Sequence, residues 1–337
     1  MSFATYVGRR TLFALLAVYL VVTATFAVVA LTPNTDLGGA IGSMQRSGAT
    51  PAEIDAFVEQ YREERGLDDP LHVRYVDWLA DVSTLDFGYS FAMETEVSDV
   101  LWPGVQRTAF YTIPALVFAV LLGTLLGAIS GSLNGGVSDW TARIIVYAAV
   151  GVPTFIGAFV FLKPFYADIE WIRLLRWDHT PFYNRGFVVN PNAGLWPTSN
   201  PLRFLAPAAI FALALVGWQL RYVRTAYLDR DGDESVKLHA AKGAGRVRRA
   251  RHVLRNAAVP IVSASLSELL AVVLLNIYVI ETVFGIQGVA ALNMIAVRAR
   301  DMPLVIATSL VLALGGILAS YVQDLLYGYL DPRIGTE

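Results

Sequence analysis

The sequence predicts an all-α integral membrane protein with about six transmembrane helices, both termini inside the cell, and a small folded outer segment after the first span. Hydrophobic residues make up 55% of the 337 residues, and the mean hydropathy is +0.51. Only 16% are charged, whereas about 25% is usual in soluble domains. The charged residues also occur in blocks separated by long uncharged runs, which is typical of a protein whose apolar segments lie in a bilayer.

A spanning helix needs about 20 apolar residues, because the hydrocarbon core is about 30 Å thick. Six runs are candidates: Thr11–Leu31, Thr108–Ser138, Ile144–Leu162, Phe204–Leu220, Asn256–Ile280 and Met302–Gln323. They divide the chain into an N-terminal tail with the first span (1–31), an outer segment (32–107) and a five-helix core (108–337). The core contains a loop over residues 221–259.

The distribution of charged residues predicts the orientation of the chain in the membrane. With the N-terminus inside, the inner pieces hold 14 Lys and Arg against 8 Asp and Glu, and the outer pieces hold 12 against 18. The positive-inside rule therefore places the arginine-rich loop 221–259 in the cytoplasm. An alternative is that Gly8-Arg9-Arg10 begins a cleaved twin-arginine export signal, but the apolar run Thr11–Leu31 is longer than a signal peptide needs.

The outer segments have their own patterns. In residues 51–67, Ile54, Phe57, Val58 and Tyr61 recur at helical spacing after a Thr50-Pro51 start, so a helix in a folded cap is expected. Residues 163–203 are rich in aromatic side chains, which collect at membrane interfaces.

Three glycines, Gly123, Gly127 and Gly131, fall on one face of the second span. Small residues at this spacing let two helices approach closely in lipid. We interpret them as a packing surface.

The cytoplasmic loop has the pattern of a helix, an acidic break over 231–234, a second helix, a glycine turn and a third helix. Asp233 or Ser235 is expected to cap the second helix, and Gly243 and Gly245 to end it. The small side chains in this turn leave its backbone accessible to another protein. The alternative is a basic loop that binds anionic lipid headgroups, which explains the arginines but not the glycine turn.

The residues of this loop resemble the EAA loop of permease subunits in binding-protein-dependent ABC importers, in particular the dipeptide, oligopeptide and nickel class. The resemblance rests on His239-Ala240-Ala241-Lys242-Gly243 and on Leu254-Arg255-Asn256-Ala257-Ala258-Val259-Pro260. Asp86-Phe87-Gly88-Tyr89-Ser90, Glu281-Thr282-Val283-Phe284 and Arg300-Asp301-Met302-Pro303 also match that class. The acidic residue of the general EAA pattern is absent, and Lys237 or Leu238 occupies that region.

The resemblance implies that the loop is a coupling helix seated on a cytoplasmic ATPase. The coupling residues would be Lys237, Leu238, His239, Ala240, Ala241, Lys242, Gly243, Ala244 and Gly245. It implies a multi-pass protein of a prokaryotic cell membrane that works with a second, homologous permease, two ATPase subunits and an extracytoplasmic solute-binding protein. Peptides are the expected cargo, with nickel or oligosaccharide as alternatives.

The chain itself is expected to be neither an enzyme nor a nucleic-acid-binding protein. It lacks a G-x-x-x-x-G-K-[ST] phosphate loop, so ATP and Mg²⁺ are expected on the partner ATPase, and no cofactor or metal on this chain. The sequence contains no cysteine. A membrane-embedded enzyme is disfavoured because HExxH and GxSxG are absent, and an ion-gradient-driven secondary transporter because no internal repeat is evident.

Two polar residues fall inside the fifth span. Glu268 is a costly carboxylate in lipid and therefore a candidate for the translocation pathway. Asn276 lies about 80° from it around the helix, so both side chains could face one cavity. The alternative is that Glu268 is neutral or paired at a subunit interface.

Overall fold

The computed structural model describes residues 3–31, 35–64, 68–133 and 205–330, with scattered positions between 136 and 160. Its described elements are helices, except for an antiparallel hairpin of β1 (Tyr89–Ser90) and β2 (Thr95–Glu96), in which Ser90 pairs with Thr95. The all-α prediction is thus confirmed. The aromatic segment 163–203 lies outside the described residues.

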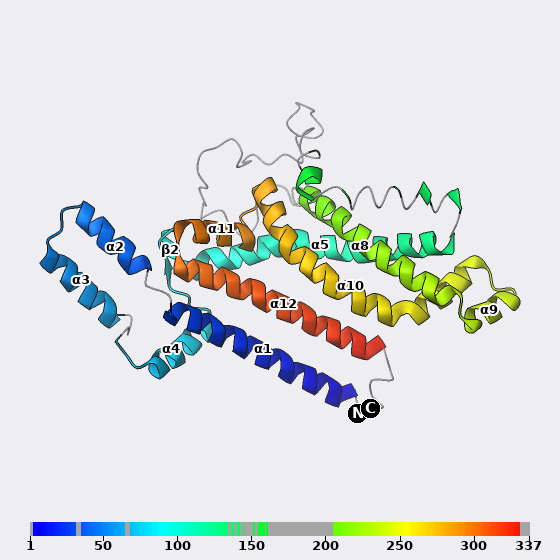
Figure 1. Ribbon diagram of the computed structural model, residues 1–337, viewed down its shortest axis with the longest axis horizontal. Helices are drawn as coiled ribbons and strands as arrows, with labels where there is room; N and C mark the ends of the chain where they lie inside the picture. Colours follow the sequence, from blue (N-terminus) through cyan, green and yellow to red (C-terminus); the bar gives the residue numbers. More distant parts are fainter. Residues whose placement is uncertain are drawn as a thin grey trace. The chain divides into compact units, whose positions relative to one another are not determined.

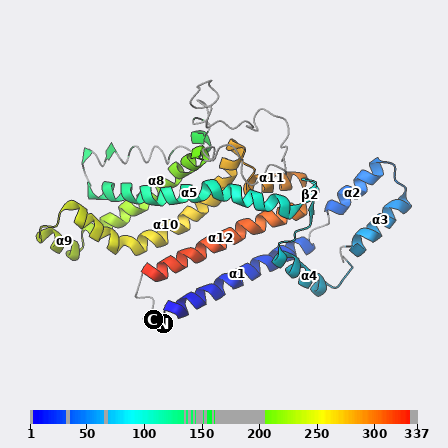
Figure 2. The ribbon, with the colours of Figure 1, turned by 180° about the vertical axis from the view of Figure 1, so that it is seen from behind.

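The chain divides into two compact units. Unit 1 comprises Met1–Ala14, Gln106–Gly288 and Gly316–Glu337, and unit 2 comprises Leu15–Val105 and Val289–Gly315. The helices are α1 (Phe3–Leu31), α2 (Thr35–Arg46), α3 (Pro51–Glu64), α4 (Leu71–Thr84), α5 (Val97–Ser132), α8 (Leu205–Asp231), α9 (Glu234–Ala241), α10 (Arg246–Phe284), α11 (Val289–Ala299) and α12 (Met302–Leu330). Within unit 1, α8 and α10 pack together and α9 lies at their common end (Figures 1 and 2).

Among the described residues, three helices are long and apolar enough to cross a membrane: Phe3–Val28, Val97–Ser132 and Met302–Tyr329. They correspond to the first, second and last predicted spans. A fourth crossing is present if the bent pair Val272–Phe284 and Val289–Ala299 forms one broken span. Most of the predicted third span, Ile144–Leu162, lies outside the described residues, so the count of six remains a prediction.

The helices extend beyond the apolar runs that predicted them. Helix α5 begins at Val97 rather than Thr108, and α8 continues past Leu220 to Asp231. Helical hydrogen bonds are satisfied within the segment itself, so a helix need not stop where the hydrocarbon ends. As a result, most of the predicted loop 221–259 is helical, and α9 with its two flanking turns forms the connection between α8 and α10.

The predicted glycine packing surface is confirmed, and its partner is α8. Gly123, Gly127 and Gly131 lie against Gln219, Val223 and Tyr227 respectively, which are also spaced four residues apart. A Cβ atom on any of the three glycines would lie less than 3 Å from an atom of α8. Close approach is therefore possible only because these positions carry no side chain.

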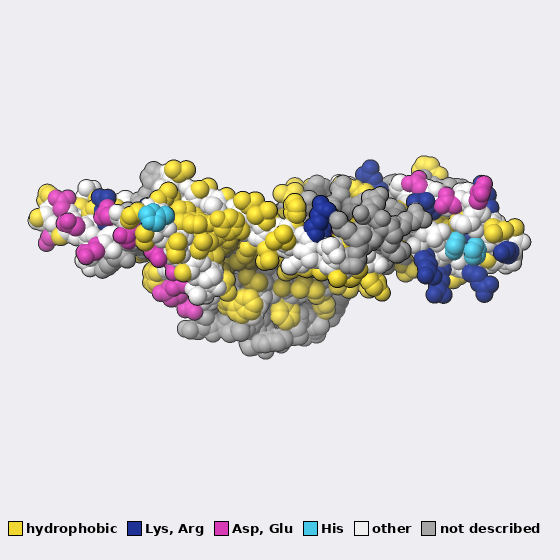
Figure 3. Space-filling view, turned by 90° about the horizontal axis from the view of Figure 1, so that it is seen from below, with side chains coloured by type: hydrophobic (Ala, Val, Ile, Leu, Met, Phe, Trp, Pro, Cys, Tyr) yellow, Lys and Arg dark blue, Asp and Glu magenta, His cyan; other side chains and the backbone are white. Residues whose placement is uncertain are grey.

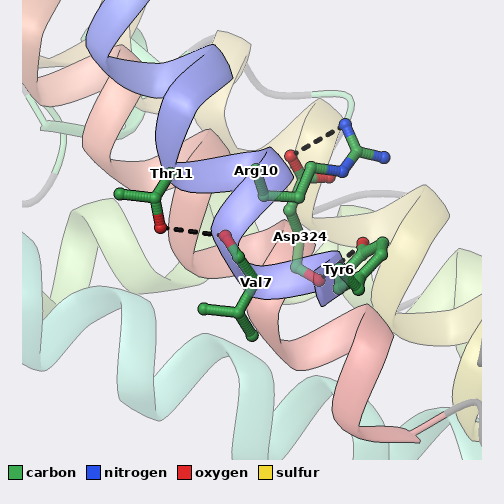
Figure 4. Close-up of polar contacts among 5 residues, drawn as sticks. All are labelled: Tyr6, Val7, Arg10, Thr11 and Asp324. Atoms are coloured by element: carbon green, nitrogen blue, oxygen red, sulfur yellow. Dashed lines mark hydrogen bonds and ion pairs between the residues drawn. The ribbon is translucent and has the colours of Figure 1, made fainter. Parts of the chain in front are cut away.

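The two ends of unit 1 are joined by polar contacts between α1 and α12 (Figure 4). The Arg10 Nη1 atom lies 3.2 Å from Asp324 Oδ2, and the Tyr6 hydroxyl donates to the Asp324 backbone carbonyl at 3.0 Å. Thr11 Oγ1 donates to Val7 and lies 2.8 Å from the Tyr321 hydroxyl. These contacts give the start of α1 a structural role, which favours a retained helix over a cleaved signal.

In unit 2, the predicted outer helix is α3, which begins with a capping box. The Thr50 backbone N–H donates to Glu53 Oε2 at 2.7 Å, and the Glu53 N–H donates to Thr50 Oγ1 at 3.4 Å. The Thr50 hydroxyl also donates to Glu53 Oε2 at 2.9 Å, and the hydrogen bonds that the carboxylate accepts from the Thr50 backbone N–H and hydroxyl lower the pKa of Glu53. The prediction of a helix after Thr50-Pro51 is confirmed.

Asp301 ties the β-hairpin of unit 2 to the start of α12. Its Oδ2 atom accepts hydrogen bonds from Ser90 Oγ at 2.6 Å and from the Ala92 N–H at 2.8 Å, while Oδ1 accepts from the Leu304 N–H at 3.2 Å. The carboxylate is buried, and these donors offset the cost of removing it from water. Unit 2 also contains an apolar core formed by α5, α11 and α12: Val97, Val100, Leu101, Leu292, Ala296, Leu304 and Ala307.

We predict that Gly127→Ala destabilises the protein by about 1–3 kcal/mol, the usual cost of adding a methyl group to a packed core. The new Cβ would meet Val223 and the Leu220 carbonyl oxygen of α8. Gly315→Ala is the matched control, because nothing lies within 4 Å of its Cβ position. Thermal unfolding in detergent should show a lower transition temperature for Gly127→Ala alone. Equal transitions for both variants would show that α5 and α8 do not pack closely.

Candidate functional site

The candidate site is the connection between α8 and α10, in which α9 is a short helix between two turns. The predicted order of helix, acidic break, helix, glycine turn and helix is confirmed. Asp233 directly precedes α9, and its carbonyl accepts hydrogen bonds from the N–H groups of Val236 and Lys237. Ser235 lies inside α9, so of the two predicted caps Asp233 holds the capping position.

The glycine turn after α9 has a defined geometry. Gly243 adopts φ +76°, and the Ala244 N–H donates back to the His239 carbonyl at 3.1 Å. This left-handed residue with a backward hydrogen bond is the usual way in which a helix ends at glycine. Gly245 has a different role from the predicted one: it adopts φ −63° and precedes α10 as its N-cap residue.

Helix α9 is anchored on its inner side by one buried residue. Val236 is buried together with Ala128, Tyr227 and Val253, so the cluster joins α9 to α5, α8 and α10. Burying a valine side chain contributes about 2 kcal/mol. Burial of Tyr227, together with the nearby Asp231 carboxylate, raises the pKa of the Tyr227 hydroxyl.

Polar and aromatic contacts complete the attachment of α9. The rings of His239 and His252 stack with centroids 4.0 Å apart. The Asn256 amide donates to His252 Nε2 at 3.3 Å, and His239 Nδ1 donates to the Ser235 carbonyl at 2.9 Å. Arg249 of α10 lies 3.3 Å from Asp231 at the end of α8. These contacts link α9 to α10, and the end of α8 to the start of α10.

The outer side of this connection is exposed. Lys237, Ala241, Lys242, Gly243 and Gly245 are exposed, whereas His239 and Ala244 are half-buried. Two apolar side chains, Leu238 and Val247, are 54% and 85% exposed on either side of the turn. The Ala240 side chain lies outside what the structure describes.

Basic residues surround these apolar side chains. Figure 3 shows Lys and Arg side chains gathered over α9 and the start of α10. A shallow groove is lined by Gly245, Val247, Arg248 and Arg251. Apolar side chains within a charged rim are typical of a surface that contacts another protein.

Of the two predicted pathway residues, only Asn276 has a described side chain. The Asn276 side chain is half-buried and donates to the Val272 carbonyl of its own helix at 2.8 Å. Glu268 lies on α10, but its side chain lies outside the described part of the chain. Their assignment to a pathway stays a prediction.

A different carboxylate in unit 1 is well enclosed. Glu281 is buried, and its Oε1 atom accepts hydrogen bonds from Thr108 Oγ1 at 2.6 Å and from the Tyr111 hydroxyl at 3.1 Å. Its backbone carbonyl accepts from the Ile286 N–H at 2.9 Å, which stabilises the turn after α10. The carboxyl group lies against Gly288, where a Cβ atom would collide with it.

Sequence reasoning missed the anchoring residues of α9. Val236, Tyr227 and Val253 carry no local signal that they meet, because helical spacing predicts a buried face but not its partner. The stacking of His239 on His252 could not be predicted from the sequence either, although both histidines belong to the loop. The exposed apolar pair could have been found, since Leu238 and Val247 both lie among basic residues.

Comparisons with known proteins agree with the resemblance. Residues 120–336 match the sequence model of the family described as the binding-protein-dependent transport system inner membrane component. The chain is 26% identical over 334 residues to a dipeptide transport system permease protein of Bacillus subtilis (strain 168), covering 98% of both chains. It is 28% identical over 295 residues to a probable D,D-dipeptide transport system permease protein of Escherichia coli (strain K12), covering 83% of this chain and 85% of the relative. A glutathione transport system permease protein of Salmonella typhimurium is 24% identical over 333 residues, with 98% of each chain covered.

We predict that Gly243→Ala loosens the end of α9, because an alanine at φ +76° costs about 1–2 kcal/mol. Gly245→Ala is the matched control, since Gly245 has an ordinary φ and open space around it. Hydrogen exchange of the peptide 234–245 should be about tenfold faster in Gly243→Ala and nearly unchanged in Gly245→Ala. Equal exchange in the two variants would contradict the left-handed geometry at Gly243.

Proposed function

The chain belongs to the family of binding-protein-dependent transport system inner membrane components, and we propose that it is the permease subunit of an ATP-driven peptide importer whose cytoplasmic ATPase docks on α9. The observation that carries this proposal is the exposed turn at Gly243, held between the long helices α8 and α10. As a member of this family the chain is a multi-pass subunit of the cell membrane and not the ATPase.

Peptide is the favoured cargo. The three relatives named above are described as permeases for dipeptides, D,D-dipeptides and glutathione, and all three cargoes contain peptide bonds. Two of these similarities extend over 98% of this chain, so they include its outer segment as well as its spans. Nickel or an oligosaccharide is the alternative cargo for the same architecture.

The family is defined by dependence on a binding protein, and it works with an ATPase. We propose the specific assembly of this chain with a second, homologous permease and two ATPase subunits. ATP and Mg²⁺ are held by the ATPase subunits, because this sequence lacks a phosphate loop. ATP is therefore hydrolysed on the ATPase subunits, and this chain contributes the membrane pathway.

The geometry of α9 suggests how force reaches the membrane. An ATPase surface that seats Leu238 and Val247 would contact the outer side of the connection. On the inner side, the buried contact of Val236 with Tyr227 and Val253 links α9 to α8 and α10. A displacement of α9 is therefore passed to both helices together, which is the behaviour expected of a rigid element between two domains.

An ion-gradient-driven transporter is the second candidate function. It would operate without an ATPase or a binding protein. The exposed loop favours the ATP-driven importer, because a solvated apolar pair in a basic rim has no role in a transporter that works alone.

We predict that Gly243→Glu abolishes ATP-dependent peptide uptake while leaving membrane insertion intact. The substitution places a bulky, negatively charged side chain in the exposed turn that we assign to ATPase docking. Gly232→Glu is the matched control, because Gly232 lies in the same connection, is exposed and also has no atom within 4 Å of its Cβ position. Uptake by membrane vesicles and co-purification with the ATPase measure the two effects.

Gly243→Ala separates docking from backbone strain. If strain alone matters, Gly243→Ala should lose uptake as fully as Gly243→Glu. Normal uptake by Gly243→Glu would show that this turn is not the docking element, and uptake by the purified chain without an ATPase would refute the importer itself.

A further inference from the structure

Helix α4 of unit 2 packs against the outer half of α1. Thr23 Oγ1 donates its proton to the Tyr19 carbonyl at 2.8 Å, so the Tyr75 hydroxyl, 2.7 Å away, donates to Thr23 Oγ1. Phe26 meets the Tyr75 ring edge-on, with centroids 5.2 Å apart, and the Trp78 ring at 6.2 Å. Two aromatic residues of α4 therefore fix it to α1.

These contacts set the depth of α4 relative to the membrane. The apolar run of α1 extends from Thr11 to Leu31. At about 1.5 Å per residue, Thr23 lies about 12 Å and Phe26 about 8 Å before the outer end of this run. An amphipathic helix at a membrane surface is buried by about 5–10 Å. Phe26, which contacts both Tyr75 and Trp78, lies within this range, so α4 is at the level of the interface between headgroups and acyl chains.

The distribution of side chains on α4 fits this location. At 100° per residue, Arg74, Asp77 and Asp81 fall within a sector of about 60°. The remaining surface is mainly apolar, and the polar residues within it lie near the two ends of the helix: His72, Ser83 and Thr84. Such a wide apolar surface with a narrow charged strip is typical of a helix lying in the membrane plane.

Part of this apolar surface has no protein against it among the described residues. Val76 is 61% exposed and Leu71 is 60% exposed, and no residue of α4 is fully buried. In the view of Figure 3, hydrophobic side chains gather where α4 and the outer half of α1 lie. In water this exposure would be unfavourable by about 25 cal/mol per Å².

We infer that α4 is an interfacial helix whose apolar surface, including Leu71, Val73 and Val76, lies in the lipid of the outer leaflet. Lipid is favoured over a protein partner by the helix to which α4 is attached. Only 11% of the spanning window of α1 is buried, against 28% for α5 and for α12. Helix α1 is thus the least covered of the three helices by the described residues, which favours contact with lipid, and its Val28 and Leu20 are also exposed, at 61% and 55%. This inference concerns a different part of the chain from α9 and does not depend on ATPase docking.

The absence of cysteine from the sequence allows a direct test. Val76→Cys and Asp77→Cys are made separately in the full chain within the assembled importer and labelled with a bimane fluorophore. Each is reconstituted in vesicles of phosphatidylcholine, with or without bromine atoms on the acyl chains. Aqueous iodide is the second quencher. Val73→Cys repeats the measurement on the apolar surface in case Val76→Cys folds poorly.

We expect the label at Val76→Cys to lose most of its fluorescence in brominated vesicles and to resist iodide. The label at Asp77→Cys should behave in the opposite way, because it lies in the charged strip. Quenching of Val76→Cys by iodide alone would place α4 in water and overturn the inference. Protection from both quenchers would show that a protein subunit covers this surface, which overturns it equally.

Discussion

The close approach of α5 and α8 at three glycines is the contact on which the candidate site depends. Gly131 leaves room for the Tyr227 ring beside α5, and Tyr227 is one of the side chains that bury Val236. Val236 in turn is the buried anchor of α9. A packing contact between two helices of the core thus determines where the exposed turn at Gly243 is held. This dependence explains how a loop with few contacts of its own can have a defined position.

The inner and outer sides of α9 carry different kinds of residue for different reasons. The inner side has an apolar anchor and a pair of stacked imidazoles, which fix the helix to its neighbours. The outer side has small residues, two exposed apolar side chains and a basic rim, which favour contact with another protein over contact with water. The alternative of a lipid-binding loop accounts for the rim, but the exposed glycine backbone adds nothing to headgroup binding.

Much of the fold was predictable from local patterns. The apolar runs predicted three of the membrane helices, the four-residue spacing of Gly123, Gly127 and Gly131 predicted a packing surface, and the glycines of the loop predicted the end of α9. These features depend on residues close together in the sequence. The contacts of Tyr227 with Val236, and of Tyr75 with Thr23, join distant segments and leave no periodic trace. The apolar runs also do not predict the first turns of α5, because hydropathy marks the edge of the hydrocarbon, whereas the backbone of α5 is helical outside it.

The contact between Tyr6 and Asp324 also constrains the topology of the whole chain. Since the start of α1 and the end of α12 touch, these two helix ends lie on the same side of the membrane (Figure 1). A chain that starts and finishes on one side crosses an even number of times. Among the described residues there are three unbroken membrane helices, so at least one further crossing is required, and the bent pair Val272–Phe284 and Val289–Ala299 can supply one. The parity of the fold thus follows from the polar contacts that join the start of α1 to the end of α12.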